Sequence, residues 1–412
     1  MYSTAMESLL ARFYRLAAVN ILSNIMVPLA SLVDVAFLGH LSDISYLAGV
    51  SLAAILFSYL YRLLNFLRLG TTGVTAQAVG QDDHKEVLLL LLRNGLIALG
   101  LGLIILILQY PLREIGFFIL SASPDVKLAG IDYFNARIWG APAVVVNLVL
   151  IIRWGWNSAG AGLASGLSQY VALLFGLVFF LGEVDWQQLS AAIPKLKESS
   201  GFKAAFVLNG NILIRTVAIM STLALFTELS AILGTVVLAE NSILLQIILF
   251  TIFFFEGIGF ATESLSGYFK GKNNNDSLLA LVRISVGISL VVGITLASAC
   301  NLFPETLFGL LTNHAEVIAP LKVYDRWLFV VLVSSSIAFM LDGYFIGLAE
   351  GSIVRNVAVA AALLVFVPVA AIAWYFHNNH ILWLALSSFI LSRAIMLLIQ
   401  LPKTFVTDSC TT

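Results

Sequence analysis

Eleven stretches of about 20 mostly apolar residues follow one another along this chain, and no other feature constrains its fold as strongly. A helix needs about 20 such residues to cross the hydrocarbon core of a bilayer. Short polar turns separate the stretches, and no strand-like alternation of apolar and polar residues competes with them. The sequence therefore predicts an all-α polytopic membrane protein with about 11 transmembrane helices. The stretches are 16–38, 47–69, 87–110, 131–152, 158–182, 204–227, 236–262, 278–302, 323–349, 354–376 and 381–401.

The composition agrees with burial in lipid. Of the 412 residues, 60% are hydrophobic and 11% are charged, whereas a soluble domain carries about 25% charged residues. Lys plus Arg (22) nearly balances Asp plus Glu (23), so nothing suggests a nucleic-acid partner. Residues 1–15 lack the cleavage site of a removable signal peptide. We expect a multi-pass protein of the cell inner membrane, a monomer whose partners are the lipid bilayer and small organic substrates.

Residues typical of metal, cofactor or catalytic sites are scarce. Cys300 and Cys410 lie in an apolar helix end and a polar tail, which predicts neither a disulfide framework nor a metal cluster. His377 and His380 flank two asparagines, which indicates a polar loop rather than a metal site. The sequence has no glycine-rich phosphate loop and no paired catalytic motif. It predicts no enzyme and no cofactor, with H⁺ or Na⁺ as the coupling ion.

Three longer polar segments interrupt the pattern. Residues 112–130 and 302–321 are expected to be connections that lie on the membrane surface. Residues 182–203 carry three lysines and a proline and are the best candidate for a linker. We therefore predict an N-terminal lobe at 1–182, an inter-lobe loop at 183–203 and a C-terminal lobe at 204–412.

The two predicted lobes are related to each other in sequence. Four matches recur at corresponding helix positions with one offset of 191 (211 − 20 for the first), and four in register are hard to attribute to chance. Repeated halves are common in transporters, whose substrate site lies between them near the membrane midplane. The matched pairs are Asn20 with Asn211, Leu47 with Leu238, Gly80 with Gly271 and Tyr133 with Tyr324.

The offset then changes within the first half. Leu163 matches Leu384 with an offset of 221, so the first half lacks about 30 residues (221 − 191) that the second half has. The change falls between Leu150 and Leu163, where the second half contains a whole further helix at about 354–376. The sequence therefore predicts five helices in the first half and six in the second.

An odd number of crossings conflicts with the distribution of basic residues, which favour the cytoplasmic side of short loops. The N-terminus and the second connection are placed inside by Arg12, Arg15, Lys85 and Arg93, and the second half takes the same orientation from Lys270, Lys272, Arg355 and Lys403. The same orientation requires an even number of crossings in the first half, whereas five crossings would invert the second half. Either the charge rule is violated, or residues 133–181 cross an odd number of times, or the chain is a shortened version of a twelve-helix parent. We favour the third, because the missing block is about one helix and a turn.

Four segments resemble those of one transporter family. The stretch PLASLVDVAFLGHL (28–41) resembles the first-helix motif of the multidrug and toxic compound extrusion (MATE) family, and TGVTAQAVG (72–80) its second-helix ending. The stretch ESLSGYFKG (263–271) looks like the counterpart in the second half. The LDG of 341–343, with Arg355 soon after, looks like the branch typified by DNA-damage-inducible protein F. The resemblance covers nearly the whole chain, and its specificity comes from the combination.

The resemblance implies a V-shaped pair of six-helix lobes that alternate between inward-open and outward-open states. It implies export of amphipathic, often cationic compounds in exchange for H⁺ or Na⁺. Family members carry further N-lobe cation-site residues, an Asn and an Asp, on the fifth helix. This is the helix that the present sequence is expected to lack.

Asp34 is the first candidate for ion coupling. It lies inside an apolar stretch, where a carboxylate costs several kcal/mol unless it is protonated, paired or hydrated. Pro28, six residues earlier, frees a backbone carbonyl and permits a bend that could couple protonation to helix shape. The alternative is a structural acid bonded to a neighbouring helix.

Three further acids are candidates in the second half. Glu256 and Glu263 are seven residues apart, which places both on one face of a helix, as a proton or substrate relay requires. Glu263 could instead be a solvated helix end near Lys270. Asp342, inside its own apolar stretch, is a candidate for the same coupling role or for a structural bond between helices.

Other polar and aromatic residues are weaker candidates. Asn147, Tyr59 and Phe253 are assigned to the substrate cavity, because amides can bind ligands and aromatic rings can stack on a cation. Asn147 could equally join two helices, and the two rings could face lipid. The long arginines Arg68 and Arg215 are expected to reach toward the membrane surface in structural roles.

The sequence supports a secondary active antiporter that exports organic compounds by alternating access. A lipid or precursor flippase could use the same architecture, and the missing helix leaves a shortened, inactive transporter open. A channel is disfavoured by the two-half repeat within one chain, and an intramembrane enzyme by the lack of a catalytic pair.

Overall fold

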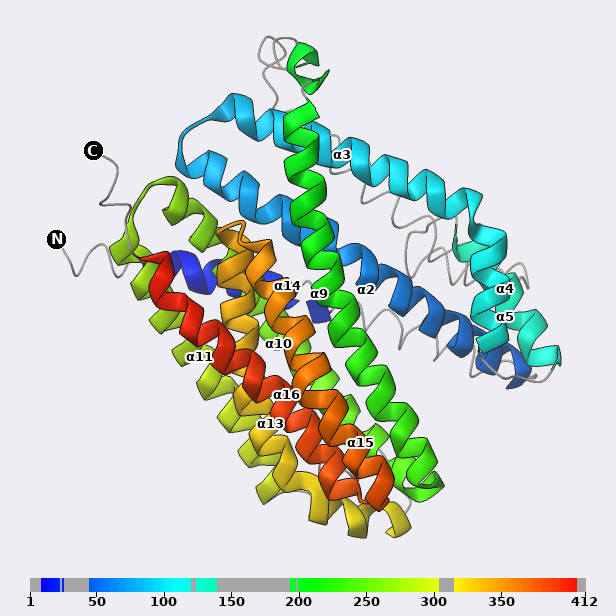
Figure 1. Cartoon of the computed structure of the whole chain (residues 1–412). Helices are drawn as coiled ribbons and strands as arrows, with labels where there is room; N and C mark the ends of the chain where they lie inside the picture. The colour runs from blue at the N-terminus through cyan, green and yellow to red at the C-terminus, as the bar shows by residue number, and fades with distance from the viewer. Residues whose placement is uncertain are drawn as a thin grey trace. The chain divides into compact units, whose positions relative to one another are not determined.

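The computed structural model describes residues 9–22, 24–25, 44–119, 124–138, 193–197, 199–303 and 315–405. Throughout these ranges the chain is helical, apart from short turns and helix ends (Figure 1). The helices are α2 (Ile44–Gly80), α3 (His84–Ile107), α4 (Gln109–Ile119), α5 (Pro124–Arg137), η2 (Ile193–Lys197), α9 (Ser199–Leu233), α10 (Thr235–Gly271), α11 (Asn275–Leu302), α13 (Ala315–Gly347), α14 (Gly351–Ala360), η3 (Ala361–Phe366), α15 (Val367–Phe376), α16 (Asn379–Gln400) and η4 (Leu401–Thr404).

The described helices confirm the predicted fold class. Seven of them are long and apolar enough to cross a membrane: α3, α9, α10, α11, α13, the run α14–η3–α15, and α16. Each of the seven coincides with a predicted stretch, and α2 covers the predicted stretch 47–69. The predicted stretch 131–152 is described only up to residue 138, and the predicted stretch 158–182 lies outside the described residues.

Several helices extend into segments predicted as connections. Helix α13 begins at Ala315, inside the predicted connection 302–321, and α9 begins at Ser199, inside the predicted linker. Helix α10 continues to Gly271, nine residues past its predicted end at 262. In this part of α10 the polar side chains of Glu263 and Ser266 are buried, so hydropathy alone placed the end of the helix too early.

The chain divides into two compact units. The first comprises Met1–Asn24, Phe66–Leu90 and Phe202–Thr412, and the second comprises Ile25–Asn65 and Leu91–Gly201. The predicted C-terminal lobe, 204–412, falls entirely within the first unit. The division into lobes at 182 stays a prediction.

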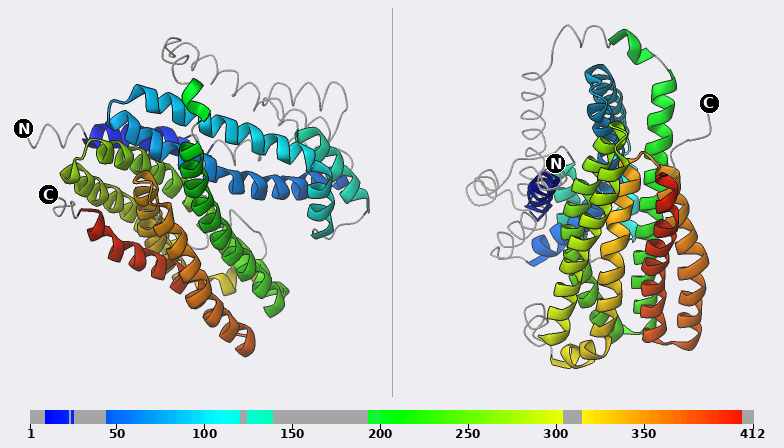
Figure 2. Two further views of the ribbon diagram at one scale, coloured as in Figure 1. Left: turned by 45° about the horizontal axis from the view of Figure 1, so that its top comes forward. Right: turned by 90° about the vertical axis from the view of Figure 1, so that its left-hand side faces the viewer.

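Helix α13 is the centre of the first unit. It packs against α10, α11, α14 and α16, and these helices run alongside one another (Figures 1 and 2). Buried apolar side chains such as Phe226, Phe366 and Trp383 fill the space among them. Many large apolar residues of the same helices are exposed, as expected for surfaces that meet lipid and not water.

The helix that spans 351–376 is interrupted by a wider turn. Residues Ala361–Phe366 form a π-helical segment between α14 and α15. Pro368 follows two residues after the end of this segment. Proline has no backbone N–H, and its ring crowds the carbonyl four residues earlier. A π turn in front of a proline relieves that crowding without ending the helix.

Three glycines allow α2, α10 and α13 to approach backbone to backbone. A Cβ atom on Gly267 of α10 would lie 2.6 Å from the carbonyl oxygen of Gly73 in α2 and 3.1 Å from that of Gly347 in α13. The Gln77 side-chain amide donates a hydrogen bond to the Gly347 carbonyl oxygen at 2.8 Å. We call Gly73, Gly267 and Gly347 the glycine contact. Close approach of small residues is the usual way in which membrane helices pack tightly.

A buried amide network joins α9, α10 and α16. The side-chain amide of Asn241 donates to Ser230 Oγ and to Asn379 Oδ1, both at 2.8 Å. Its carbonyl oxygen accepts from Asn379 Nδ2 at 3.1 Å and from Trp383 Nε1 at 2.8 Å. All four side chains are buried, so every donor that loses its partner would stay unsatisfied.

Replacing Asn241 with alanine is therefore expected to lower the stability of the unit by about 1–2 kcal/mol, a typical range for bonds between membrane helices. The thermal midpoint of the purified protein in detergent measures the effect. Thr227→Ala is the matched control, because the Thr227 hydroxyl is exposed and bonds only to the Leu223 carbonyl of its own helix. An equal midpoint for Asn241→Ala and Thr227→Ala would contradict the prediction.

The second unit has an aromatic core of its own. Phe57 of α2 stacks on Phe134 of α5 with ring centroids 5.0 Å apart, and Phe117 of α4 meets Phe134 edge to face at 6.4 Å. Val50, Ala53 and Tyr133 complete the cluster. The helices α4 and α5 thus pack through buried rings, although the sequence predicted residues 112–130 as a surface connection.

Candidate functional site

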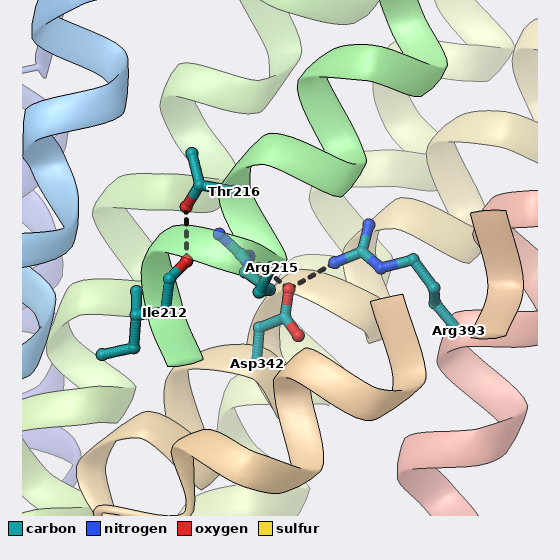
Figure 3. A network of polar contacts seen from close by, with 5 residues as sticks. All are labelled: Ile212, Arg215, Thr216, Asp342 and Arg393. Atoms are coloured by element: carbon teal, nitrogen blue, oxygen red, sulfur yellow. Dashed lines mark hydrogen bonds and ion pairs between the residues drawn. The ribbon is translucent and has the colours of Figure 1, made fainter. Parts of the chain in front are cut away.

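Asp342 lies between two arginines in the first unit. Its Oδ2 atom accepts hydrogen bonds from Arg215 Nη2 of α9 and from Arg393 Nη2 of α16, and both contacts are ion pairs (Figure 3). The side chains of Asp342 and Arg393 are 4% and 2% exposed. One carboxylate therefore joins α9, α13 and α16 inside the unit.

The helix around Arg215 is fixed by neighbouring bonds. One residue on, Thr216 donates its hydroxyl to the Ile212 carbonyl oxygen at 2.9 Å, within the same helix (Figure 3). One turn before Arg215, Asn211 accepts a hydrogen bond from Arg355 Nη1 of α14 at 2.7 Å. These contacts hold the segment of α9 that carries Arg215 against α13 and α14.

Glu263 of α10 is a fully buried acid. Its side chain is 0% exposed, and neither carboxyl oxygen has a hydrogen-bond partner among the described residues. Two guanidinium groups, those of Arg68 and Arg215, act on it electrostatically without a hydrogen bond. An ionised carboxylate is costly in such a place, whereas a protonated one is compatible with it.

The backbone at Glu263 is part of the tight packing between α10 and α13. A Cβ atom on Gly347 would lie 2.3 Å from the Glu263 carbonyl oxygen and 2.0 Å from Ser266 Oγ. Ser266 Oγ donates to the Glu263 carbonyl at 3.0 Å and lies 3.3 Å from the Tyr344 carbonyl. The position of Glu263 relative to α13 is thus set by contacts that allow little displacement.

Glu256 lies two helical turns from Glu263 on α10, as the spacing predicted, and it is half-buried. Arg68 of α2 interacts electrostatically with both glutamates. The Arg68 guanidinium also lies 3.7 Å from the centroid of the Phe260 ring and donates to Asn20 Oδ1 at 3.1 Å. The position of the Arg68 guanidinium is therefore fixed by a ring and an amide.

The predicted site residues are only partly brought together. Glu256, Glu263 and Asp342 lie in the first unit, the two glutamates on α10 and Asp342 on α13, which packs against α10. Asp34 and Asn147 lie outside the described residues. Tyr59 is 50% exposed and Phe253 is half-buried, with a carbonyl oxygen that accepts from Asn24 Nδ2 at 3.5 Å.

The sequence prediction was wrong about one arginine, Arg215, and did not single out another, Arg393. The expectation that Arg215 reaches the membrane surface is wrong, because its side chain is 11% exposed and paired with Asp342. Arg393 was not singled out. The available signal was a lone arginine inside an apolar stretch, since such a charge almost always has a partner within the bundle. The sequence does not say which acid is that partner, because α13 and α16 are far apart in the chain.

Comparison with known proteins gives consistent matches. The family model described as MatE matches residues 20–154 and 212–372. DNA damage-inducible protein F from Escherichia coli (strain K12) is 30% identical over 418 positions, covering 93% of this chain and 90% of the relative. Multidrug export protein MepA from Staphylococcus aureus is 19% identical over 424 positions, covering 93% and 91%. The solved structure of a MOP superfamily transporter from Pyrococcus furiosus superposes with a TM-score of 0.82 at 17% identity, covering 97% of this chain and 96% of the other.

The alignment with the Escherichia coli relative also contains gaps in this chain. Since 93% of 412 residues is about 383, roughly 35 of the 418 aligned positions have no counterpart here. That number is close to the block of about 30 residues by which the first half falls short of the second. The missing helix itself stays a prediction.

Proposed function

This chain belongs to the MatE family of multidrug efflux transporters, which are transporters rather than enzymes, and on that basis we propose that it exports amphipathic, preferably cationic, organic compounds in exchange for protons. It is a multi-pass protein of the cell inner membrane. We propose that Glu263 is the acid in the C-terminal part of the chain that carries the exchanged proton. Asp34, which the sequence places in the first apolar stretch, has the corresponding role in the N-terminal half.

The observation that carries the proposal is the burial of Glu263 without a hydrogen-bond partner among the described residues. A structural acid in a helical bundle normally has hydrogen-bond partners, as Asp342 has at Oδ2. A fully buried carboxyl that satisfies neither oxygen is unfavourable whenever it is charged and unpaired. It therefore favours either a bound proton or the arrival of another positive charge.

Protons fit this site better than sodium ions do. Transporters that bind Na⁺ supply several oxygen ligands, often from unwound helix backbone. Helix α10 is continuous from Thr235 to Gly271, so its carbonyls near Glu263 stay within the helix. A proton, in contrast, needs only one oxygen of the carboxylate and no further ligands.

A cationic substrate would compete with the proton for the same carboxylate. Two ligands that exclude each other at one site are negatively linked, and negative linkage is what an antiporter requires. An anionic substrate would bind better beside the protonated carboxyl, which would give cotransport instead. The exchange of H⁺ for a cation is thus the combination that the charges favour.

The purified full-length chain in proteoliposomes tests the proposal. The vesicles are loaded with dansylcholine, which is permanently cationic, or with dansylamide, its neutral counterpart. An inward pH gradient is expected to accelerate the efflux of dansylcholine, and an inward Na⁺ gradient at equal pH is not. Acceleration by Na⁺ alone would contradict proton coupling. No protein-dependent efflux under either gradient would favour a shortened, inactive transporter.

The orientation of the shortened chain gives a separate prediction. We expect the segment before α9 to lie in the cytoplasm, because Lys195, Lys197 and Lys203 cluster there and basic loops favour that side. A cysteine at Ser199, in a Cys300→Ala, Cys410→Ala background, should react with a membrane-impermeant maleimide only after the cells are opened. Labelling of intact cells would mean that the second half is inverted, and the antiporter proposal would then fail for this chain.

A further inference from the structure

The turns that follow α2 and α10 have the same backbone structure. Asp82 and Asn273 have positive φ angles of 57° and 52°, and they are 191 residues apart (273 − 82). One residue later, Asp83 and Asn274 each accept a hydrogen bond at a side-chain oxygen from the backbone N–H three residues further on, both at 3.0 Å. The 191-residue repeat of the sequence is therefore present in the structure of these two turns.

The two helix ends also contact each other, and the contact is reciprocal (Figure 1). A Cβ atom on Gly80 would lie 2.2 Å from the carbonyl oxygen of Tyr268, and one on Gly271 would lie 2.1 Å from that of Gln77. Tyr268 corresponds to Gln77 in the repeat, as Gly271 does to Gly80, with the same offset of 191. Each half thus presents the same glycine to the same carbonyl of the other half, so an approximate two-fold axis relates them. We call Gln77, Gly80, Tyr268 and Gly271 the turn contact.

The turn contact can separate without leaving its carbonyls unpaired. The Gln77 carbonyl oxygen accepts a hydrogen bond from the Gln81 N–H at 3.0 Å. The Tyr268 carbonyl oxygen accepts one from the Lys272 N–H at 3.1 Å. Each bond lies within its own half, so both remain when the two helix ends move apart. A buried polar group that loses its partner is costly, and separation of these ends does not create one at either carbonyl.

The turn contact lies near Glu263, toward one end of the first unit. Glu263 is eight residues before Gly271, which is about 12 Å along α10. Between them, Gly267 meets Gly73 of α2 in the glycine contact, so α2 and α10 stay close over this whole distance. Of α2 and α3, the segment Phe66–Leu90 belongs to the same unit as α10, and the rest of both helices belongs to the other unit. The contact between α2 and α10 therefore lies between the level of Glu263 and this end of the unit.

We infer that the turn contact is a cytoplasmic gate, closed in this structure, whose two sides part when Glu263 becomes accessible from the cytoplasm. Lys85, Lys270 and Lys272 lie beside the two turns, and basic residues favour the cytoplasmic side. An exporter takes up its substrate from that side, so the gate has to open in each cycle. This inference rests on the proposed function, because it takes the chain to be an exporter. The two-fold relation adds a condition: each glycine closes the same interface, so replacing either one has the same effect, and replacing both adds little.

The test measures the distance between the two turns in the full-length protein, without any substrate. Spin labels are attached in a Lys85→Cys, Asp276→Cys, Cys300→Ala, Cys410→Ala background, since positions 85 and 276 are exposed and correspond in the repeat. Double electron–electron resonance then gives the distribution of label distances. Gly80→Ala and Gly271→Ala are each expected to move the population to a longer distance, because the added Cβ atom pushes against a carbonyl oxygen of the other half. The double variant is expected to move it no further than either single variant.

Gly210→Ala on α9 is the matched control, because a Cβ atom at that position would meet nothing within 4 Å. It is expected to keep the wild-type distribution of distances. The inference is overturned if either variant of the turn contact also keeps that distribution, if only one of the two glycines matters, or if Gly210→Ala moves the population as far.

A second measurement leaves both glycines in place, so it does not depend on the folding of a glycine variant. In proteoliposomes, the cysteine pair introduced at positions 85 and 276 is joined by a cleavable bis-maleimide. Efflux of dansylcholine is expected to fall by about tenfold or more and to return after cleavage, because the closed gate then cannot part. Undiminished efflux after complete cross-linking would overturn the gate. No efflux before cross-linking would instead count against the proposed function, and the label distances would still decide whether the turns separate.

Discussion

The variant Glu263→Gln is expected to lose pH-gradient-driven efflux of dansylcholine almost completely, by about 100-fold or more, which corresponds to at least about 2.7 kcal/mol. Glutamine has the shape of protonated glutamate but cannot release a proton or attract a cation. Because neither Glu263 oxygen has a hydrogen-bond partner among the described residues, the amide removes no existing bond. The variant should therefore fold normally, with a thermal midpoint at or above that of the wild type.

Glu228→Gln is the matched control for that variant. Glu228 lies on α9 in the same unit and is exposed, so removing its charge should leave transport unchanged. Efflux and thermal midpoint are measured for both variants in parallel. If Glu263→Gln responds to the pH gradient as the wild type does, Glu263 is not the coupling acid.

The variant Gly347→Leu is expected to prevent folding of the first unit, with a loss of stability above about 4 kcal/mol. Even a Cβ atom at this position would lie 2.0 Å from Ser266 Oγ and 2.3 Å from the Glu263 carbonyl oxygen. The neighbouring atom at 2.3 Å belongs to helix backbone, so α10 and α13 would have to separate. That separation would also break the Gln77 bond to Gly347 and displace Glu263.

The yield of monodisperse protein from size-exclusion chromatography measures this effect. The control is Gly287→Leu on α11, where a Cβ atom would meet nothing within 4 Å. Gly287→Leu should give the wild-type yield, and Gly347→Leu little or none. Equal yields would show that α10 and α13 do not need the glycine contact.

The sequence predicted the fold better than the ends of its helices. Apolar stretches located each described spanning helix, because the bilayer requires about 20 apolar residues wherever a helix crosses. They failed at residues 263–271, where α10 continues although its residues become polar. There Ser266 and Gly267 pack against other helices, and hydropathy cannot distinguish a polar residue that faces a neighbouring helix from one that faces water.

The candidate acids were predictable for the same physical reason. A charge inside an apolar stretch is costly, so Asp342 was identifiable from the sequence alone, and Glu263 from its spacing of seven from Glu256. Their partners were not. Arg215 and Arg393 are 127 and 51 residues from Asp342 in the chain, and only the packing of α9 and α16 against α13 brings them together. The contrast between a doubly paired Asp342 and a Glu263 without a bonded partner is therefore a property of the fold.

The most direct test of the central claim is whether movement of the substrate drives movement of protons. Vesicles with the full-length protein are loaded with dansylcholine and the pH-sensitive dye pyranine, and diluted into probe-free buffer at the same pH. We expect the lumen to acidify as the probe leaves with wild-type protein, and to keep its pH with Glu263→Gln. Loss of dansylcholine from wild-type vesicles without acidification would contradict proton exchange as the function of this chain.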